Sequence, residues 1–124
     1  MANALESVTR EQVENMIERG DVVLVDALPT ISYAATHLPG AVSMPPETVD
    51  ERADRRIPNR RTDVVVYCAN PTCDSSHMVA QRLIELGYLS VRHYAGGKDE
   101  WTAAGLPLEG GRASAPATGE TTTP

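Results

Sequence analysis

Cysteine is the residue of this sequence best suited to covalent chemistry, and its two copies, Cys68 and Cys73, lie five residues apart. Both fall in the stretch "VVVYCANPTCDSS", Val64 to Ser76, where an apolar run meets a polar loop. A cysteine thiolate is both a nucleophile and a metal ligand. The pair therefore has four candidate roles: a nucleophile, a metal site, a disulfide or ordinary packing.

Cys68 ends the run "DVVVYC", whose continuous apolar residues are typical of a central parallel strand covered on both faces. Residues Ser75 to Leu86 then follow helical spacing, so the unit is a strand, a loop and a helix. Open α/β sheets bind ligands at the carboxyl ends of their strands. Loop amides and the helix N-terminus stabilise a thiolate or a bound anion there. This position predicts that Cys68 is a nucleophile; the alternative is a small buried apolar residue.

The ligand count disfavours a metal site. Structural zinc usually has four ligands, and the imidazoles available beside the two thiols are His37, His77 and His93. His77 could meet the cysteines at the start of the helix, but the sequence offers no second ligand pair. We therefore expect no metal ion, and the predicted chemistry needs no organic cofactor.

A structural disulfide is the weaker interpretation of the cysteine pair. A bridge between Cys68 and Cys73 would close a very small loop, which stabilises a domain little. The sequence has no apolar run long enough to cross a bilayer, and "MANALESVTREQ" lacks the order of a signal peptide. These features predict a cytoplasmic protein with no membrane partner, whose cysteines a reducing compartment keeps as thiols.

The rest of the pattern predicts the elements that position Cys68. Thr9 and Gln12 form a capping-box pattern at the start of a helix that Gly20 ends. The run "VVLVDA" from Val22 predicts a second buried strand. Further elements are a short helix at 31–36, a brief strand at 41–44, a strand in "SVRHYAGG" and a short helix in "KDEWTAAG". This alternation predicts an α/β fold of three layers, with a central, mostly parallel sheet flanked by helices.

Length and composition limit the number of domains and the kinds of binding partner that the chain can have. The 124 residues, 41% of them hydrophobic, suit one compact domain. We assign it to residues 1–109 and expect a disordered tail over residues 110–124, which are rich in Gly, Ala, Ser, Thr and Pro. A net charge of −6 argues against a nucleic-acid partner, since such binding depends on clustered Lys and Arg. The arginine cluster between Arg52 and Arg61 is interspersed with acids and predicts a solvated surface connector.

Three separated motifs make the chain resemble the single-domain rhodaneses over residues 7–109. The segment "VLVDALPTISYAATHLPGAVSMP" is similar to the first motif of that family, "VVVYC" with its following helix to the active-site strand, and "GGKDEWTAAGLPLE" to the closing motif. The resemblance implies a rhodanese fold. For an active member it also implies a cysteine that takes a sulfane sulfur as a persulfide and passes it to a nucleophilic acceptor.

Carried over to this sequence, the resemblance assigns the catalytic nucleophile to Cys68. It assigns the loop that cradles the sulfur to Ala69, Asn70, Pro71, Thr72, Cys73, Asp74, Ser75 and Ser76. It gives structural roles to Asp26, His37, Gly40, Gly96, Gly97 and Trp101. Cys73 is in addition a candidate resolving thiol, since a second thiolate in the loop can attack a persulfide and leave a disulfide.

The loop departs from the family pattern in its charge. Many sulfurtransferases of this family have C-x4-R, with an arginine that binds the thiosulfate dianion, and the same count from Cys68 reaches Cys73 here. Asp74 adds a negative charge where an oxyanion would lie, and it stands at the arginine position of the related C-x5-R phosphatases. Leu28 and Pro29 replace the Arg-Glu pair often found after the aspartate of the first motif. These departures predict poor use of free thiosulfate and disfavour phosphatase chemistry.

We therefore expect a cytoplasmic sulfurtransferase that carries sulfane sulfur as a persulfide on Cys68 and receives it from a small sulfur donor or a persulfide-bearing protein. One alternative is a non-catalytic rhodanese module that binds a protein partner, in which Cys68 would not be alkylated quickly. Another is a dithiol redox sensor that uses Cys68 and Cys73. It would form a reversible disulfide with peroxide but would transfer no sulfur.

Overall fold

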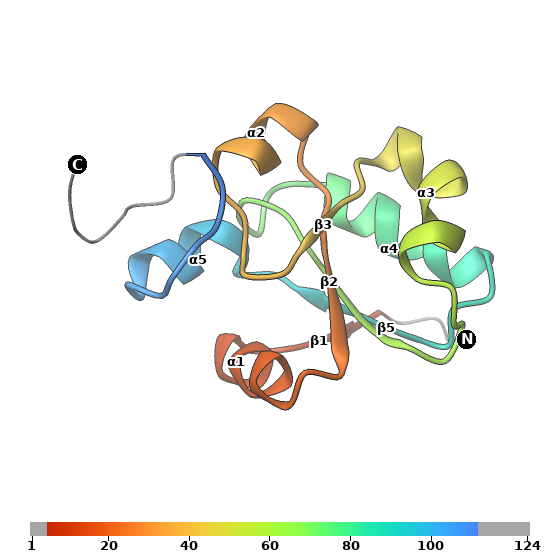
Figure 1. Ribbon diagram of the computed structural model, residues 1–124, viewed down its shortest axis with the longest axis horizontal. Helices are drawn as coiled ribbons and strands as arrows, with labels where there is room; N and C mark the ends of the chain where they lie inside the picture. The colour runs from red at the N-terminus through yellow and green to blue at the C-terminus, as the bar shows by residue number, and fades with distance from the viewer. Residues whose placement is uncertain (1–4, 112–124) are drawn as a thin grey trace.

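A computed structural model describes residues 5–111 of the chain, whose arrangement Figure 1 shows. The strands are β1 (Glu6–Ser7), β2 (Val22–Asp26), β3 (Val42–Ser43), β4 (Asp63–Tyr67) and β5 (Ser90–Tyr94). The helices are α1 (Arg10–Arg19), α2 (Thr30–Ala35), α3 (Val49–Arg56), α4 (Ser75–Glu85) and α5 (Gly97–Ala103), with a 3-10 turn at Pro46–Thr48. The expected tail lies outside the described residues except for positions 110 and 111.

The strands form one parallel sheet in the order β1-β5-β4-β2-β3, with β4 at its centre. Asp26 of β2 pairs with Tyr67 of β4, and Tyr67 pairs with Tyr94 of β5. These three strands therefore end level with one another, and the residue after β4 emerges at the middle of the carboxyl edge. The α/β fold with a parallel central sheet is confirmed.

Helices cover both faces of the sheet, which makes three layers (Figure 1). Val64 and Val66 of β4 pack with residues of α3 and α4 on one face. Val65 and Tyr67 pack on the other face with residues of α1 and α5. All four side chains have no exposed surface, and burial of each stabilises the fold by roughly 1.5–3 kcal/mol. The continuous apolar run of β4 follows from this two-sided cover.

Local sequence signals of α1 are confirmed in atomic detail. The Thr9 hydroxyl accepts a hydrogen bond from the Gln12 amide at 3.1 Å, and the Gln12 side chain accepts one from the Thr9 amide at 2.8 Å. Gly20 ends the helix with φ +77°, a left-handed conformation that glycine adopts without a steric penalty. The capping box therefore fixes where the first helix begins.

The prediction of a solvated connector for the arginine-rich segment is wrong in part, because the segment forms the helix α3. Val49, Ala53 and Ile57 recur every four residues and are buried against the core. Arg82 of α4 donates to both carboxylate oxygens of Asp50, at 2.6 and 2.8 Å, which links the two helices. The three apolar residues form only a narrow stripe on a helix whose other residues are mostly charged. For this reason the composition of the segment predicted a solvent-exposed connector rather than a packed helix.

The edge strand β1 was not predicted from the sequence. It is two residues long, and Glu6 and Ser7 pair in parallel with Arg92 and His93 of β5. Two residues are too few to show a period, so only the pairing reveals the strand. Among residues 5–111, no helix is both long and apolar enough to cross a membrane.

Candidate active site

Cys68 is the first residue after β4 and lies at the carboxyl edge of the sheet. Its side chain is buried, with 2% of the residue exposed. Its carbonyl oxygen accepts a hydrogen bond from the Lys98 amide at 2.9 Å, and the Ala69 carbonyl accepts one from the Asp99 amide at 2.8 Å. The first turn of α5 thus holds the start of the 68–76 loop in place.

Gly97 allows α5 to come this close to the loop. A Cβ atom at this position would lie 2.5 Å from the Cys68 carbonyl oxygen and 2.9 Å from the Ala69 carbonyl carbon. Its φ of +66° is also left-handed. The resemblance gave Gly97 a structural role, and the contacts identify that role as close backbone approach to the cysteine loop.

Gly105 offers a matched control for a substitution at Gly97, because it has φ +75° and a Cβ atom added there would meet nothing within 4 Å. We expect Gly105→Ala to lower the free energy of unfolding by about 1–2 kcal/mol, the cost of left-handed backbone for a residue with a Cβ. Gly97→Ala should lower it by at least about 1 kcal/mol more, since backbone atoms must also move. Urea unfolding of both variants measures the difference. Equal losses would show that the loop tolerates the added atom.

A tight turn around Asn70 brings the second cysteine back to the first. The Asn70 side-chain oxygen accepts hydrogen bonds from the Thr72 amide at 3.1 Å and the Thr72 hydroxyl at 2.7 Å. The Asn70 carbonyl accepts one from the Cys73 amide at 3.2 Å. Such a turn, in which an Asn side chain binds the backbone two residues on, reverses the chain within a few residues. The Cα atoms of Cys68 and Cys73 lie 6.2 Å apart as a result.

Cys68 and Cys73 are joined by a disulfide. The expectation that the two cysteines are thiols is therefore wrong for the state that the structure describes. The short sequence separation predicts little entropic gain from a bridge, but it does not exclude one. The Asn70 turn brings the Cα atoms into the 4.4–6.8 Å range that a disulfide spans.

The end of the loop joins directly to α4, which begins at Ser75 as expected. Asp74 precedes the helix, and its carbonyl accepts a hydrogen bond from the Met78 amide at 3.1 Å. The amides of a helix's first turn have no acceptor within the helix, so the N-terminus of α4 presents donors on the loop side. Of the predicted loop residues, Ala69 to Asp74 lie between Cys68 and the helix, and Ser75 and Ser76 belong to the first turn of α4.

The Ser76 side chain makes a contact that residue spacing did not predict. Its hydroxyl is fully buried and lies 2.8 Å from the Nε2 atom of His93 on β5. Burial, and then the nearby His77 ring, hold the pKa of His93 below its usual value, so the neutral imidazole is favoured. Ser76 therefore joins α4 to the sheet through its side chain. Val91 and His93 are two residues apart on β5 and so lie on the same face of the strand. This spacing, with Ser90 and Arg92 on the other face, was the sequence signal for the buried imidazole.

The charged side chain within the loop and the one bound to Asn70 are both negative. Asp74 lies within the loop, and the Asp99 carboxylate accepts a hydrogen bond from the Asn70 side-chain amide at 3.3 Å. The nearby Lys98 ammonium donates instead to the carbonyls of Ser32 and Thr36, at 3.3 and 2.7 Å, and so binds α2. Backbone amides rather than cationic side chains are therefore the donors that the loop itself offers to an anion.

Asp26 supports the sheet edge beside Cys68. Its buried carboxylate accepts hydrogen bonds from the Tyr67 hydroxyl at 2.8 Å and from the Leu28 amide at 2.9 Å. The same Tyr67 hydroxyl accepts one from the Leu38 amide at 3.0 Å. Burial raises the pKa of Asp26, while the two donors act in the opposite direction. The network ties the ends of β2 and β4 to the segment after α2.

His37 and Trp101 of the family motifs also have structural contacts. The His37 Nδ1 atom lies 2.7 Å from the Tyr33 carbonyl oxygen, and the two rings stack with centroids 3.9 Å apart. The Gly40 amide donates to the Glu109 carboxylate at 2.9 Å, which joins the first motif to the last. Trp101 packs in the core on the α1 face with 2% of its surface exposed. These contacts agree with the structural roles expected for the three motif residues.

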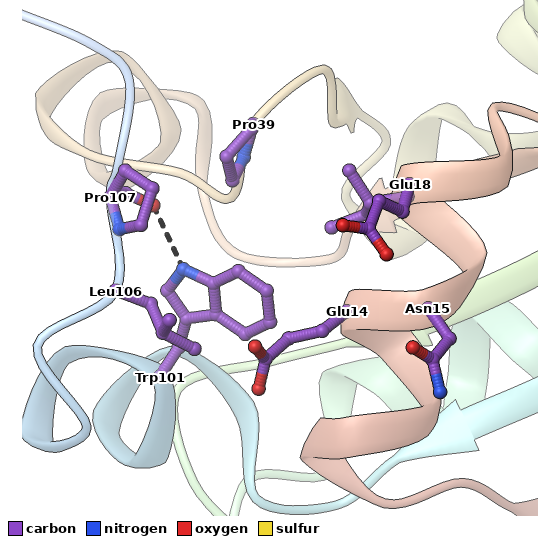
Figure 2. Close-up of a pocket in the computed structure, with 8 residues that line it drawn as sticks. Glu14, Asn15, Glu18, Pro39, Trp101, Leu106 and Pro107 are labelled. Atoms are coloured by element: carbon purple, nitrogen blue, oxygen red, sulfur yellow. Dashed lines mark hydrogen bonds between the residues drawn. The ribbon is translucent and has the colours of Figure 1, made fainter.

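A separate hollow of about 250 Å³ lies between α1 and the segment after α5. Figure 2 shows Trp101 in it, with the indole N–H donating to the Pro107 carbonyl oxygen at 2.8 Å. Glu14 and Glu18 of α1 line the opposite side, and Pro39 contributes to the rim. Its lining shares no residue with the 68–76 loop. Within residues 5–111, no group of three or more His, Cys, Asp or Glu side chains is arranged to hold a metal ion.

Comparison with known proteins shows which family and which relatives this chain resembles. A family model described as "Rhodanese-like domain" matches residues 9–104. The chain is 30% identical to the thiosulfate sulfurtransferase GlpE of Haemophilus influenzae, with 86% of this chain and 96% of that protein covered. It is 31% identical to the HTH-type transcriptional regulator Rv0324 of Mycobacterium tuberculosis, over 86% of this chain but only 46% of that protein.

The fold also matches a solved structure. The crystal structure of the BH2092 protein from Bacillus halodurans superposes with a TM-score of 0.80 at 23% identity, and the match covers 87% of this chain and 79% of that one. At this identity the likeness bears on the fold alone. It agrees with the parallel sheet and the helical layers described above.

Proposed function

Since this chain belongs to the rhodanese-like domain family, we propose that it is a sulfurtransferase that carries sulfane sulfur as a persulfide on Cys68. The observation that carries the proposal is the position of Cys68. It lies at the carboxyl end of the central strand, between that strand and the N-terminus of α4. The name of the Haemophilus relative, a thiosulfate sulfurtransferase, supports the same class of reaction.

The reaction begins from the reduced loop. The Cys68 thiolate attacks the terminal sulfur of a donor R–S–S⁻, the S–S bond of the donor breaks, and the donor leaves as the thiolate R–S⁻. Cys68 then holds the sulfur as a persulfide. An acceptor thiolate attacks that outer sulfur, takes it and restores the Cys68 thiolate. Amides of the loop and of the first turn of α4 stabilise the anionic sulfur in both states.

The charges disfavour a donor that brings a second anionic group beside the transferred sulfur, as the sulfonate of thiosulfate does. Asp74 lies in the loop, the Asp99 carboxylate is bound to Asn70, and the loop sequence has no Arg or Lys. A thiosulfate dianion would meet these carboxylates without a cationic side chain from the loop to bind it. We therefore assign the donor to small organic persulfides, polysulfides or a persulfide-bearing protein, rather than to free thiosulfate.

Intact mass spectrometry tests the persulfide on Cys68. The wild-type protein, Cys68→Ser and Cys73→Ser are each reduced, separated from the reductant and incubated with polysulfide or with thiosulfate. The intact masses of the three proteins are then compared. We expect polysulfide to add one sulfur to Cys73→Ser, thiosulfate to add less, and Cys68→Ser to gain none on the loop. If Cys73→Ser gains no sulfur from either donor while Cys68 stays reduced, the protein is not a persulfide carrier and the non-catalytic binding module is favoured.

A dithiol redox sensor is a second candidate, which the Cys68–Cys73 disulfide favours. Peroxide oxidises an accessible thiolate to a sulfenic acid, which a neighbouring thiol converts to a disulfide. For a sensor, peroxide would close the bridge rapidly and sulfur donors would leave Cys73→Ser unmodified. For the sulfurtransferase, the donor would modify Cys68 in that variant.

A further inference from the structure

We propose that Cys73 resolves the persulfide of Cys68, so that the protein reduces sulfane sulfur to sulfide and ends each cycle in the Cys68–Cys73 disulfide. This activity rests on the proposed function, because it needs a persulfide on Cys68. It differs from transfer to an acceptor, since the sulfur leaves as hydrosulfide. An external dithiol reductant then opens the bridge and completes the cycle.

The bridge demonstrates the contact that this step requires. The resolving thiolate must reach the inner sulfur of the persulfide, the Sγ atom of Cys68, and in the structure Cys73 is bonded to that atom. The Cα atoms are 6.2 Å apart. The hydrogen bonds of Asn70 to Thr72 and Cys73 hold the turn that sets this separation.

The inner and outer sulfurs of a Cys68 persulfide differ in their accessibility to molecules in solution. Cys68 is 2% exposed in the bridged state that the structure describes, and a persulfide formed after the bridge opens places its outer sulfur one bond farther from the backbone. An external acceptor can attack that outer sulfur. Cys73 is part of the loop and half-buried, and it reaches the inner sulfur from within the protein. The two positions of attack give two products, transfer to an acceptor or release of hydrosulfide.

The step balances as a thiol–disulfide exchange. The Cys73 thiol passes its proton, directly or through water, to the outer sulfur of the anionic persulfide, and the Cys73 thiolate forms a bond with the Cys68 Sγ atom. The bond between the two persulfide sulfurs breaks, and the outer sulfur leaves with the electron pair as HS⁻. The sulfane sulfur is reduced and the two cysteines are oxidised to the disulfide. A dithiol in solution then reduces the bridge and becomes a disulfide itself.

A single-turnover experiment tests the proposal. Reduced protein, freed of reductant, is mixed with one equivalent of a small alkyl persulfide, and released sulfide and intact mass are followed together. We expect the wild-type protein to release about one sulfide per chain and to lose two hydrogens as the bridge forms. Cys73→Ser should keep the added sulfur and release sulfide at least about tenfold more slowly, because it lacks a tethered thiol at high effective concentration. Cys68→Ser, which retains the Cys73 thiol, measures the release that does not depend on Cys68.

Asn70→Ala separates the geometry of the turn from the presence of the thiol. It retains both cysteines but removes the side-chain oxygen that accepts from Thr72. We expect the variant to form the Cys68 persulfide and to release sulfide more slowly than the wild type. An external dithiol should reopen the Cys68–Cys73 bridge and return the wild-type protein to the reduced state.

The outcomes distinguish this inference from the function on which it rests. A persulfide that persists in the wild-type protein, or sulfide release without bridge formation, would overturn the resolving role of Cys73 and leave the sulfurtransferase intact. Failure of Cys73→Ser to take up sulfur would overturn both. Sulfide release that is equal in the wild type and Cys73→Ser would also reject the resolving step.

Discussion

Cys73→Arg is expected to raise kcat/KM for thiosulfate about 10–100-fold relative to Cys73→Ser, because a charge-assisted hydrogen bond contributes roughly 1.5–3 kcal/mol. Position 73 closes the turn opposite Cys68, with 6.2 Å between the two Cα atoms. A guanidinium there would supply the cationic donor that the loop lacks. The substitution also restores the C-x4-R pattern that the family resemblance associates with thiosulfate.

Steady-state assays with thiosulfate and cyanide measure this gain. Cys73→Ser is the matched control, since both variants lack the second thiol and only one has the added charge. Asp74→Asn, introduced into each of these two variants, removes the neighbouring carboxylate and should raise kcat/KM further. The gain from Asp74→Asn should be smaller at higher salt, because ionic strength screens exposed charge. Equal rates for Cys73→Arg and Cys73→Ser would mean that loop charge does not determine donor choice.

The sequence was sufficient to predict those elements of the fold whose residues follow a simple local pattern. The apolar runs of β2 and β4 predicted a parallel sheet, because only strands covered on both faces lack polar alternation. The capping box at Thr9 and Gln12 predicted where α1 begins. These signals are local, and each depends on a few neighbouring residues. Elements whose stability comes from tertiary contacts, such as β1 and α3, were missed or misread.

The position of Cys68 was predictable, but its immediate partners were not. A strand followed by a loop and a helix places the cysteine at the sheet edge whatever the details of the loop. Closure of the Cys68–Cys73 bridge depends on the turn at Asn70, and the contact of Ser76 with His93 depends on how α4 packs on β5. The bridge and the Ser76–His93 contact both depend on distances in the folded structure, which residue type and sequence spacing do not determine. The same limit applies to Gly97, whose motif position was evident and whose contact with the Cys68 carbonyl was not.

Tyr67→Phe is expected to lower the free energy of unfolding by about 3–5 kcal/mol at neutral pH, since it leaves the buried Leu38 amide and one oxygen of the buried Asp26 carboxylate without a partner. The lost hydroxyl accepts from the Leu38 amide at 3.0 Å and donates to the Asp26 carboxylate at 2.8 Å. Asp26 and Tyr67 have no exposed surface, so water does not replace either bond. Tyr94→Phe is the matched control on the adjacent strand. It removes one bond, to the exposed Glu100, and should lower stability by about 1 kcal/mol.

The loss in Tyr67→Phe should depend on pH through Asp26. Burial already raises the pKa of this carboxyl, and the Tyr67 hydroxyl counters the rise, so its removal should move the pKa of Asp26 still higher. A carboxyl whose pKa is raised by folding stabilises the protein below its unfolded pKa, and this stabilisation is lost as pH rises through the folded pKa. The variant should therefore lose more stability relative to the wild type at pH about 7.5 than at pH about 5. Urea unfolding at both pH values measures the difference. A deficit that does not change with pH would mean that the unpaired Leu38 amide, rather than the Asp26 charge, dominates the cost.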